Sequence, residues 1–386
     1  MDYLHVDTLV AQVAKRPLQP CGDVVCSDRG PSGTLLILCD GQGSGVRANL
    51  YAEMIVSRLR QRLLGNCSLR QAFAETVRTL EKNRGVTVPW GACAVARVLP
   101  KGDTTILTYE SPPPLFFSGR QVQVLPARPS VHGCALPAIG EANCFLKPNE
   151  GLMLVSDGIT QAGLGRCIPG MPEGWGIEGV RDYLSQMVRA KQEWQTLPDA
   201  IQKKALSLWT RTGDDCTTAL LMCRRGITLS IMTGPPVNRE NDAQAVQKFM
   251  KCPGLHAVCG GTTANVVARE TGRKLEVNTE SATPLTPPAF QIHGLDLVTE
   301  GAVTLNQLYN LLDMESEQIS EQNPTVELHQ FIGVADRVRF FYGQAANPSE
   351  GSLAFRQLGV LQRRQILPMI AEKLKAAGKL VEIIPI

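Results

Sequence analysis

Acidic residues stand at the ends of apolar segments in the first half of this 386-residue sequence. Asp23 lies in CGDVV, Asp40 ends LLILCD and is followed by GQGSG, and Asp157 ends GLMLVSD and is followed by glycine. Asp214 and Asp215 precede the apolar run CTTALL. A charged group at the tip of a buried strand costs free energy unless an opposite charge compensates it. The sequence therefore predicts that cations accompany these carboxylates.

The residue types around these acids indicate which cation is expected. Carboxylates, backbone carbonyls and water are the ligands of hard divalent ions, so the pattern favours Mg²⁺ or Mn²⁺ over a thiolate-binding metal. Gly41 and Gly158 let the backbone approach an ion because they carry no Cβ. A single Asp-Gly pair is typical of a plain turn. Several pairs at the ends of apolar segments favour a metal centre instead.

Composition sets the broad class of protein. The net charge is +3, with 44% hydrophobic and 19% charged residues, and no basic arm or aromatic-interleaved basic patch predicts a nucleic-acid partner. The N-terminus lacks the pattern of a signal peptide, and no apolar run approaches the roughly 20 residues of a membrane span. We therefore expect a cytoplasmic protein without membrane contact. The 12 cysteines are scattered without zinc-site spacing, and those in apolar strands are expected to be small buried hydrophobes.

The length predicts two domains, and the pattern changes near residue 225. Short apolar runs predict strands at 34–40, 91–99, 104–110, 115–125, 151–157 and 216–224. Helical spacing covers 49–64, 68–83 and the region 179–213. Strands in series flanked by amphipathic helices favour an α+β layered sandwich. We place the first domain at 1–225 and a second at 226–386.

The second half alternates strands and helices, which predicts a compact α/β domain. Strands are expected at 227–234, 255–261, 274–278, 294–301, 337–343 and 380–386. Helices are expected at 243–251, 263–272, 304–313 and 363–378, and loops at 281–288 and 314–329.

The ordered motifs of the first half resemble the metal-dependent PP2C (PPM) serine/threonine phosphatases, and specifically their bacterial SpoIIE-like branch. The resemblance is carried by Gly-Asp at 22–23, Asp-Gly-x-Gly-Ser-Gly at 40–45, Ser-Asp-Gly-x-Thr at 156–160 and Asp-Asp-x-Thr at 214–217. The segment YESPPPLFFSGRQVQVL also looks like the Pro-Pro-Pro-Leu hairpin of that branch. The resemblance covers about residues 15–225 and does not reach the second half.

The resemblance implies a four-layer α-β-β-α sandwich with a binuclear Mn²⁺/Mg²⁺ centre at one edge. Asp40 matches the bridging carboxylate, and Gly41 matches the carbonyl ligand of one ion. Asp157 and Asp214 match the ligands of the other ion, with Asp215 as a secondary candidate, because the family pattern places the ligand first in the pair. Asp23 would hold metal-bound waters or coordinate directly.

The implied activity is hydrolysis of phosphoserine or phosphothreonine in a protein substrate by metal-activated hydroxide, without a phosphoenzyme. The bacterial branch often acts on small phosphoserine proteins that regulate sigma factors. This sequence departs from the wider family at Gln42, which replaces a histidine that could protonate the leaving group. TYES, with Glu110 and Ser111, replaces the usual Asn-Ala-Gly-His. Arg29 and Arg47 lie near the motifs, but solvated surface positions are expected for both.

The second half contains one further candidate site. In AVCGGTTANVVAR, an apolar strand passes through Gly260 and Gly261 to Thr262 or Thr263 as helix N-cap, a turn that can bind an anion. Two other predicted strands end in MTGPP and LDLVTEG. In open α/β sheets, ligands bind at the carboxyl ends of strands, so these turns could converge on one cleft. The interpretation is a small phosphorylated or nucleotide-like ligand in a regulatory domain, with a plain capping turn as the alternative.

Two other functions are open at this point. The first is a binding or scaffold protein in signalling whose phosphatase fold turns over weakly, as Gln42 and the altered proline hairpin suggest. Retention of all the costly acids argues against it. The second is a nucleotide-using enzyme whose activity resides in 226–386, although that segment lacks a lysine-bearing phosphate loop.

Overall fold

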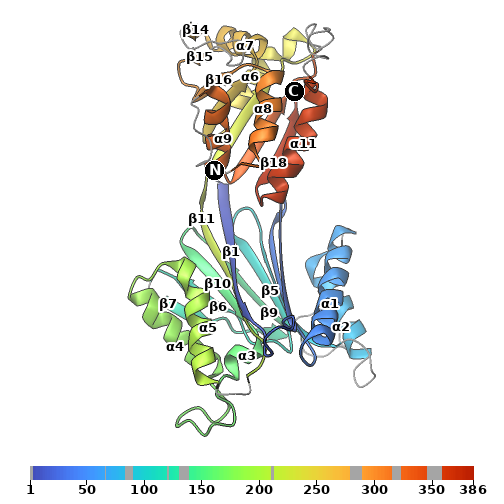
Figure 1. Ribbon diagram of the computed structural model, residues 1–386, viewed down its shortest axis with the longest axis vertical. Coiled ribbons are helices and arrows are strands. Elements are labelled where there is room, and N and C mark those ends of the chain that lie inside the picture. The colour runs from blue at the N-terminus through green and yellow to red at the C-terminus, as the bar shows by residue number, and fades with distance from the viewer. Residues whose placement is uncertain are drawn as a thin grey trace. The chain divides into compact units, whose positions relative to one another are not determined.

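The computed structural model describes residues 3–65, 67–82, 90–119, 121–129, 139–209, 213–278, 289–314, 323–345 and 359–386. The chain forms two compact units (Figure 1). The N-terminal unit is Leu4–Arg224, and the C-terminal unit is Arg225–Ile386 together with Tyr3. Within the described ranges, no helix is both long and apolar enough to cross a membrane.

Two antiparallel sheets form the centre of the N-terminal unit. The six-stranded sheet has the order β2-β3-β4-β5-β9-β8. Its strands are β2 (Asp23–Gly30), β3 (Gly33–Gly41), β4 (Gly91–Val98), β5 (Asp103–Tyr109), β8 (Arg128–Pro129) and β9 (Gly140–Phe145). The five-stranded sheet has the order β1-β11-β10-β6-β7. Its strands are β1 (Tyr3–Val13), β6 (Leu115–Ser118), β7 (Gln121–Val124), β10 (Glu150–Val155) and β11 (Cys216–Gly226).

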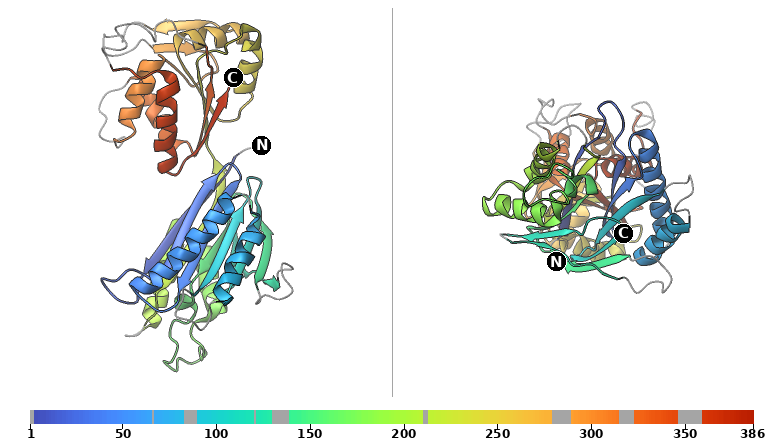
Figure 2. Two further views of the ribbon diagram at one scale, coloured as in Figure 1. Left: turned by 90° about the vertical axis from the view of Figure 1, so that its right-hand side faces the viewer. Right: turned by 90° about the horizontal axis from the view of Figure 1, so that it is seen from below.

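Helices cover the outer face of each sheet, as Figure 2 shows from below. These are α1 (Val46–Leu64) and α2 (Leu69–Lys82) on one side, and α3 (Asp157–Thr160), α4 (Gly176–Arg189) and α5 (Leu197–Leu208) on the other, where the short η1 (Trp194–Thr196) precedes α5. Three apolar clusters fill the interfaces. One joins the six-stranded sheet to α1 and α2, one lies between the sheets, and one joins the five-stranded sheet to α3–α5. The expected four-layer α-β-β-α sandwich is confirmed.

The C-terminal unit is built on a seven-stranded sheet of order β14-β15-β16-β13-β12-β17-β18. Its strands are β12 (Thr228–Thr233), β13 (Leu255–Cys259), β14 (Leu275–Asn278), β15 (Ala289–Ile292), β16 (Leu297–Thr299), β17 (Arg337–Tyr342) and β18 (Leu380–Pro385). The five strands from β16 to β18 are parallel, and β14 and β15 extend the β16 edge in antiparallel fashion.

Helices cover both faces of this sheet. One face packs against α6 (Asp242–Met250), which follows η2 (Arg239–Asn241), and against α7 (Gly261–Thr271). The other packs against α8 (Ala302–Leu311), α9 (Pro324–Val334) and α11 (Arg363–Ala376). Numbered along the chain, the parallel strands have the spatial order 3-2-1-4-5 of a doubly wound sheet. The C-terminal unit therefore has the expected α/β fold.

The structure differs from the expectations at several elements. The strands β1, β2, β8, β9 and β15 were not predicted, and the helical region 179–213 is two helices, α4 and α5. The loop expected at 314–329 is wrong at its end, because α9 begins at Pro324. There, the Asn323 side chain accepts hydrogen bonds from the backbone amides of Thr325 and Val326. The loop expected at 281–288 lies outside the described residues.

Candidate functional site

The first two predicted acids face each other at one end of the six-stranded sheet. Asp23 opens β2 and pairs in register with Asp40 near the end of β3. The Asp23 side chain is almost fully buried, with 1% of its surface exposed. Neither of its carboxylate oxygens has a hydrogen-bond partner among the described residues. Such a carboxylate is costly, and its position requires a compensating interaction.

The other predicted acids come from the five-stranded sheet. Asp157 begins α3 directly after β10, and Asp214 and Asp215 directly precede β11. β10 and β11 are antiparallel neighbours, with Val155 paired to Thr218, so the end of one strand meets the beginning of the other.

Hydrogen bonds hold these acids at the strand ends. Gln161 Nε2 donates to Asp157 Oδ2 at 3.0 Å. The Lys15 backbone amide donates to Asp215 Oδ1 at 2.7 Å, and the Asp215 amide donates to Asp214 Oδ1 at 3.0 Å. One oxygen of each of these two neighbouring carboxylates therefore accepts a backbone hydrogen bond.

Electrostatic coupling shows that the acids of the two sheets form one cluster. Burial, followed by repulsion from Asp23, Asp157 and Asp214, raises the pKa of Asp40 to about 10. Burial also raises the pKa of Asp23 to about 7, and the nearby Asp215 and Asp157 contribute to that rise. Hydroxyl groups of Thr217 and Ser156 act in the opposite direction on the pKa of Asp23 without cancelling the rise. The cluster therefore disfavours full ionisation of its own carboxylates.

Glycines allow the ends of the two sheets to come this close. A Cβ on Gly22 would lie 2.7 Å from Asp215 Oδ2, and one on Gly158 would lie 2.1 Å from the Asp215 carbonyl oxygen. A Cβ on Gly41 would lie 1.9 Å from the Ala48 carbonyl oxygen of α1. At Gly41 and Gly158 the contacted atoms belong to the backbone, so no side chain fits there without a backbone shift. The glycines of the acidic motifs therefore act as spacers between elements.

The donor set of this cluster fits hard divalent cations. Carboxylates dominate it, and burial raises the pKa of the nearby Cys21 and Cys216 thiols, which disfavours thiolate ligands. Among the described residues, the Asp23 oxygens lack the positive partner that burial demands. Among the described residues, however, no three acidic, histidine or cysteine side chains form a finished cation site. A ligand set of Asp40, Asp157 and Asp214 on one ion thus requires these side chains to draw together. The metal assignments remain predictions.

Positions around the cluster were also singled out in the sequence. Gln42 is exposed, and its backbone amide donates to the Trp90 carbonyl at 2.9 Å. Arg47 is exposed and donates to the Tyr51 hydroxyl at 2.6 Å, whereas Arg29 is half-buried and donates to the Val6 carbonyl. These contacts place neither guanidinium on the acidic cluster.

Three contributors to the cluster were missed in the sequence. Lys15 Nζ lies 3.4 Å from Asp214 Oδ1. Ser156 and Thr217 are both buried, and the Thr217 amide donates a hydrogen bond to Ser156 Oγ at 2.9 Å. Ser156 and Thr217 stand inside the quoted motifs, so their position was a usable signal. No sequence signal indicated Lys15, because only the fold brings it close to Asp214.

The candidate turn of the C-terminal unit differs from the expectation in its cap. Gly260, with φ of 124°, is the N-cap of α7, so Thr262 and Thr263 are not caps. Gly261 opens the helix, Thr262 is exposed, and Thr263 Oγ1 accepts a hydrogen bond from the Gly234 amide at 2.9 Å. Thr263 therefore joins α7 to the end of β12 instead of capping its own helix.

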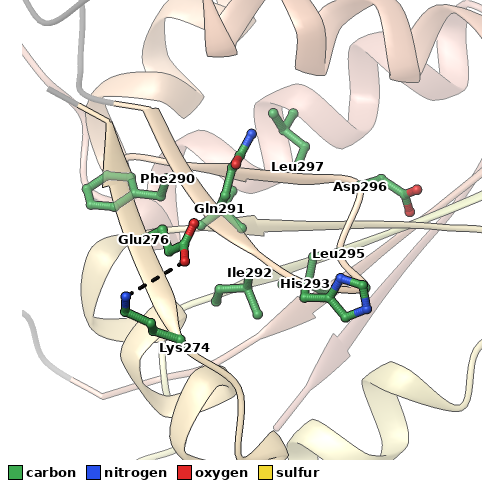
Figure 3. Close-up of a pocket in the computed structure, with 11 residues that line it drawn as sticks. Lys274, Glu276, Phe290, Gln291, Ile292, His293, Leu295, Asp296 and Leu297 are labelled. Atoms are coloured by element: carbon green, nitrogen blue, oxygen red, sulfur yellow. Dashed lines mark ion pairs between the residues drawn. The ribbon is translucent and has the colours of Figure 1, made fainter. Parts of the chain in front are cut away.

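A cavity of about 500 Å³ lies elsewhere in the C-terminal unit, beside β15 and the turn into β16. Figure 3 shows the Lys274–Glu276 ion pair on one side of it and His293 with Asp296 on the other. Asp296 Oδ2 accepts from the His256 backbone amide at 2.7 Å, which indicates a structural role for that carboxylate. His256 itself packs edge-on against Phe249.

Comparison with known proteins identifies the class of this chain. The two-sheet sandwich with acids at its edge is that of PP2C-like phosphatases, and the family model described as "Stage II sporulation protein E (SpoIIE)" matches residues 30–225. The chain belongs to the SpoIIE family. No curated protein sequence matches it.

Solved structures similar to the chain share little sequence with it. The PP2C phosphatase domain of SpoIIE from Bacillus subtilis, with a fragment of its regulatory domain, is 16% identical with a TM-score of 0.46. That match covers 58% of this chain and 65% of that chain. The RsbU and RsbW domains of Rv1364c from Mycobacterium tuberculosis are 15% identical with a TM-score of 0.47, covering 64% and 69%. RsbX in complex with magnesium is 15% identical with a TM-score of 0.39, covering 57% and 96%.

Proposed function

We propose that this protein is a metal-dependent serine/threonine protein phosphatase of the SpoIIE type. The observation that carries the proposal is the cluster of aspartates from both sheets, in which Asp23 is buried without a positively charged partner among the described residues and Asp40 has a strongly raised pKa. Such a cluster is unfavourable by itself and becomes favourable with divalent cations. Family membership supports the same class of activity.

The residues divide into roles that follow their positions. Asp40 would bridge two Mn²⁺ or Mg²⁺ ions, Gly41 would offer its carbonyl to one, and Asp157 and Asp214 would hold the other. Asp23 would accept hydrogen bonds from metal-bound water or bind directly. When bound, the ions supply hydroxide near neutral pH and offset charge on the phosphoryl oxygens.

The protein groups around the site orient these carboxylates. Gln161 Nε2 donates to one oxygen of Asp157 and so orients that carboxylate. Ser156 accepts from the Thr217 amide, which joins the end of β10 to the start of β11 beside Asp23. Gln42 has an uncharged amide and is not a general acid. The proton for the leaving serine or threonine oxygen therefore has a source other than residue 42.

The test is Mn²⁺-dependent hydrolysis of p-nitrophenyl phosphate and of a phosphoserine peptide. We expect Asp40→Asn and Asp157→Asn to lower kcat by about 100-fold or more, because the cations provide several kcal/mol of stabilisation to the transition state. Asp28→Asn is a matched control, since Asp28 lies on the same strand as Asp23 but pairs with Arg60. If chelator and both site substitutions leave the activity unchanged, the proposed metal-dependent phosphatase function is excluded.

For the C-terminal unit we propose a regulatory role, in which a ligand or partner biases the metal site. The support is its separate compact fold and the candidate ligand turn at Gly260–Thr263. Limited proteolysis that releases a 1–225 fragment tests this role. Activity of the fragment equal to that of the full chain, with every ligand tried, would argue against regulation.

A further inference from the structure

The C-terminal unit has a topological switch point at the carboxyl ends of β12 and β17. These two strands are parallel neighbours, but the chain leaves β12 toward α6 on one face and leaves β17 toward α11 on the other. In doubly wound sheets this divergence opens a crevice in which ligands bind. The groups at this edge therefore indicate which ligand the crevice accepts.

Two helices begin side by side at this edge on adjacent glycines. Gly260 is the N-cap of α7 and Gly301 is the N-cap of α8, and a Cβ on Gly301 would lie 3.4 Å from the Gly260 Cα. Among the described residues, neither cap provides a side-chain hydrogen bond to its helix. The first-turn amides of both helices point the same way, and the exposed Thr262 shows that this end of α7 reaches solvent.

A buried positive charge stands at the same edge. Arg363, the first residue of α11, is only 7% exposed, and its Nη1 donates to the Gly343 carbonyl beyond β17 at 3.4 Å. Gly234, just beyond β12, leaves room for it, since a Cβ there would lie 2.0 Å from Nη1. Burial raises the pKa of the Cys259 thiol, at the end of β13, to about 11, and the nearby Arg363 guanidinium opposes that rise only in part.

Two buried hydroxyl groups at this edge lack partners. Thr233 is the last residue of β12, in register with Cys259 and Tyr342, and its Oγ1 has no hydrogen-bond partner among the described residues. By strand alternation its side chain lies on the same face as Ile231, the face that α11 covers. Thr304 Oγ1, in the first turn of α8, is likewise unsatisfied, and both residues are 0% exposed. Two orphaned hydroxyls at the sheet edge where the guanidinium lies indicate a missing polar group.

We propose that this edge binds the phosphate group of a small organic phosphate, held by the first-turn amides of α7 and α8 and by the Arg363 guanidinium. Paired helix N-termini and a buried arginine match the charge and the acceptor oxygens of a phosphomonoester. Glu300 borders the site, and its Oε2 accepts weakly from the Gly301 amide at 3.4 Å. That carboxylate can accept hydrogen bonds from sugar hydroxyls, which favours a nucleoside or sugar phosphate over inorganic phosphate.

The test measures binding to the full chain by calorimetry, in excess chelator so that the aspartate cluster holds no cations. The probes are inorganic phosphate and adenosine 5′-monophosphate at constant ionic strength. Arg363→Gln should weaken binding at least tenfold, whereas Arg364→Gln, on the exposed next residue of α11, should leave it unchanged. A wild-type chain that binds neither probe more strongly than chloride would overturn the proposal.

A second variant separates binding from folding. Gly261 has open space around its Cα, and an acidic residue in the first turn of a helix stabilises it. Gly261→Asp should therefore keep the unfolding temperature of the ligand-free protein, yet repel a phosphate and weaken binding at least tenfold. Unchanged binding in Gly261→Asp would show that the amides of α7 do not hold the anion. Because no metal or phosphatase assay is involved, this outcome is independent of the proposed catalytic activity.

Discussion

Asp23 and Asp40 face each other in register across β2 and β3, and burial raises the pKa of the first to about 7 and of the second to about 10. Two neighbouring carboxyls in a buried site resist losing both protons. The pair therefore destabilises the metal-free protein at neutral pH, and the proposed divalent cation would offset that cost. We therefore expect stability, pH and metal binding to be coupled at this one pair of residues.

The first prediction concerns the pH dependence of the metal-free protein. The pKa of an unperturbed aspartate is 3.8, whereas the folded state raises it to about 7 for Asp23 and to about 10 for Asp40. Between 3.8 and these raised values, the folded state therefore binds more protons than the unfolded state. The stabilising contribution of the protonated carboxyls is complete below 3.8 and is lost as the pH rises through the raised values. In chelator, the free energy of unfolding should therefore fall from pH 5 to pH 8.

Asp40→Asn provides the matched variant for this prediction. The neutral amide removes the repulsion, so at pH 8 in chelator the variant should be more stable than the wild type by about 1–3 kcal/mol. Added Mn²⁺ should stabilise the wild type and not the variant. Urea unfolding at both pH values gives the numbers. A wild type whose stability rises between pH 5 and pH 8 would contradict the raised pKa values.

The second prediction tests the glycine spacers. Gly158→Ala would place a Cβ 2.1 Å from the Asp215 carbonyl oxygen, so the start of β11 must move away from α3. We expect a loss of about 1–3 kcal/mol of stability, as for other overpacked sites, together with weaker Mn²⁺ binding. Gly30→Ala is the control, because nothing lies within 4 Å of its Cβ position. Equal Mn²⁺ affinity in Gly158→Ala and Gly30→Ala would disprove the spacer role.

The aspartate motifs were predictable because each is local: an apolar run, an acid and a glycine are contiguous in the sequence. The distances between these motifs were not predictable, because the register of β2 with β3 and the approach of β10 and β11 to that pair depend on long-range packing. Lys15 shows this limit. Its contact with Asp214 joins residues 199 positions apart, and nothing in the segment around Lys15 indicates it.

Local signals also failed where tertiary contacts decided the outcome. In the C-terminal unit, Thr262 and Thr263 are good N-cap residue types, yet the N-cap of α7 is Gly260, two residues before Thr262. The tight approach to Gly301 and the bond from the Gly234 amide to Thr263 Oγ1 select that start. β1 escaped prediction because its segment contains His5 and Asp7, polar residues that only the folded state satisfies.

The third prediction concerns Lys15, whose Nζ lies 3.4 Å from Asp214 Oδ1 in a half-exposed ion pair. A divalent cation bound by Asp214 competes with this ammonium group. Lys15→Met should therefore tighten Mn²⁺ binding by about 2–5-fold, the range expected for an exposed charge pair. Lys101→Met, at an exposed turn between β4 and β5, should leave the affinity unchanged. Weaker Mn²⁺ binding in Lys15→Met, measured by calorimetry, would show that Lys15 supports the metal site.

The fourth prediction concerns the attachment of β1 through Asp7. Burial raises the pKa of Asp7, but hydrogen bonds and charge attraction from His5 and Arg224 outweigh it, so the pKa lies below its usual value. The folded state then binds fewer protons than the unfolded state, and the stabilisation is present above pH 3.8 and lost as the pH falls through the lowered value. Asp7→Asn should cost about 1 kcal/mol at pH 7 and little at pH 2.5. Guanidinium unfolding at both pH values measures this, and Asp103→Asn, on an exposed position of β5, serves as control. A cost that is equal at both pH values would show that Asp7 acts through packing, and not through its charge.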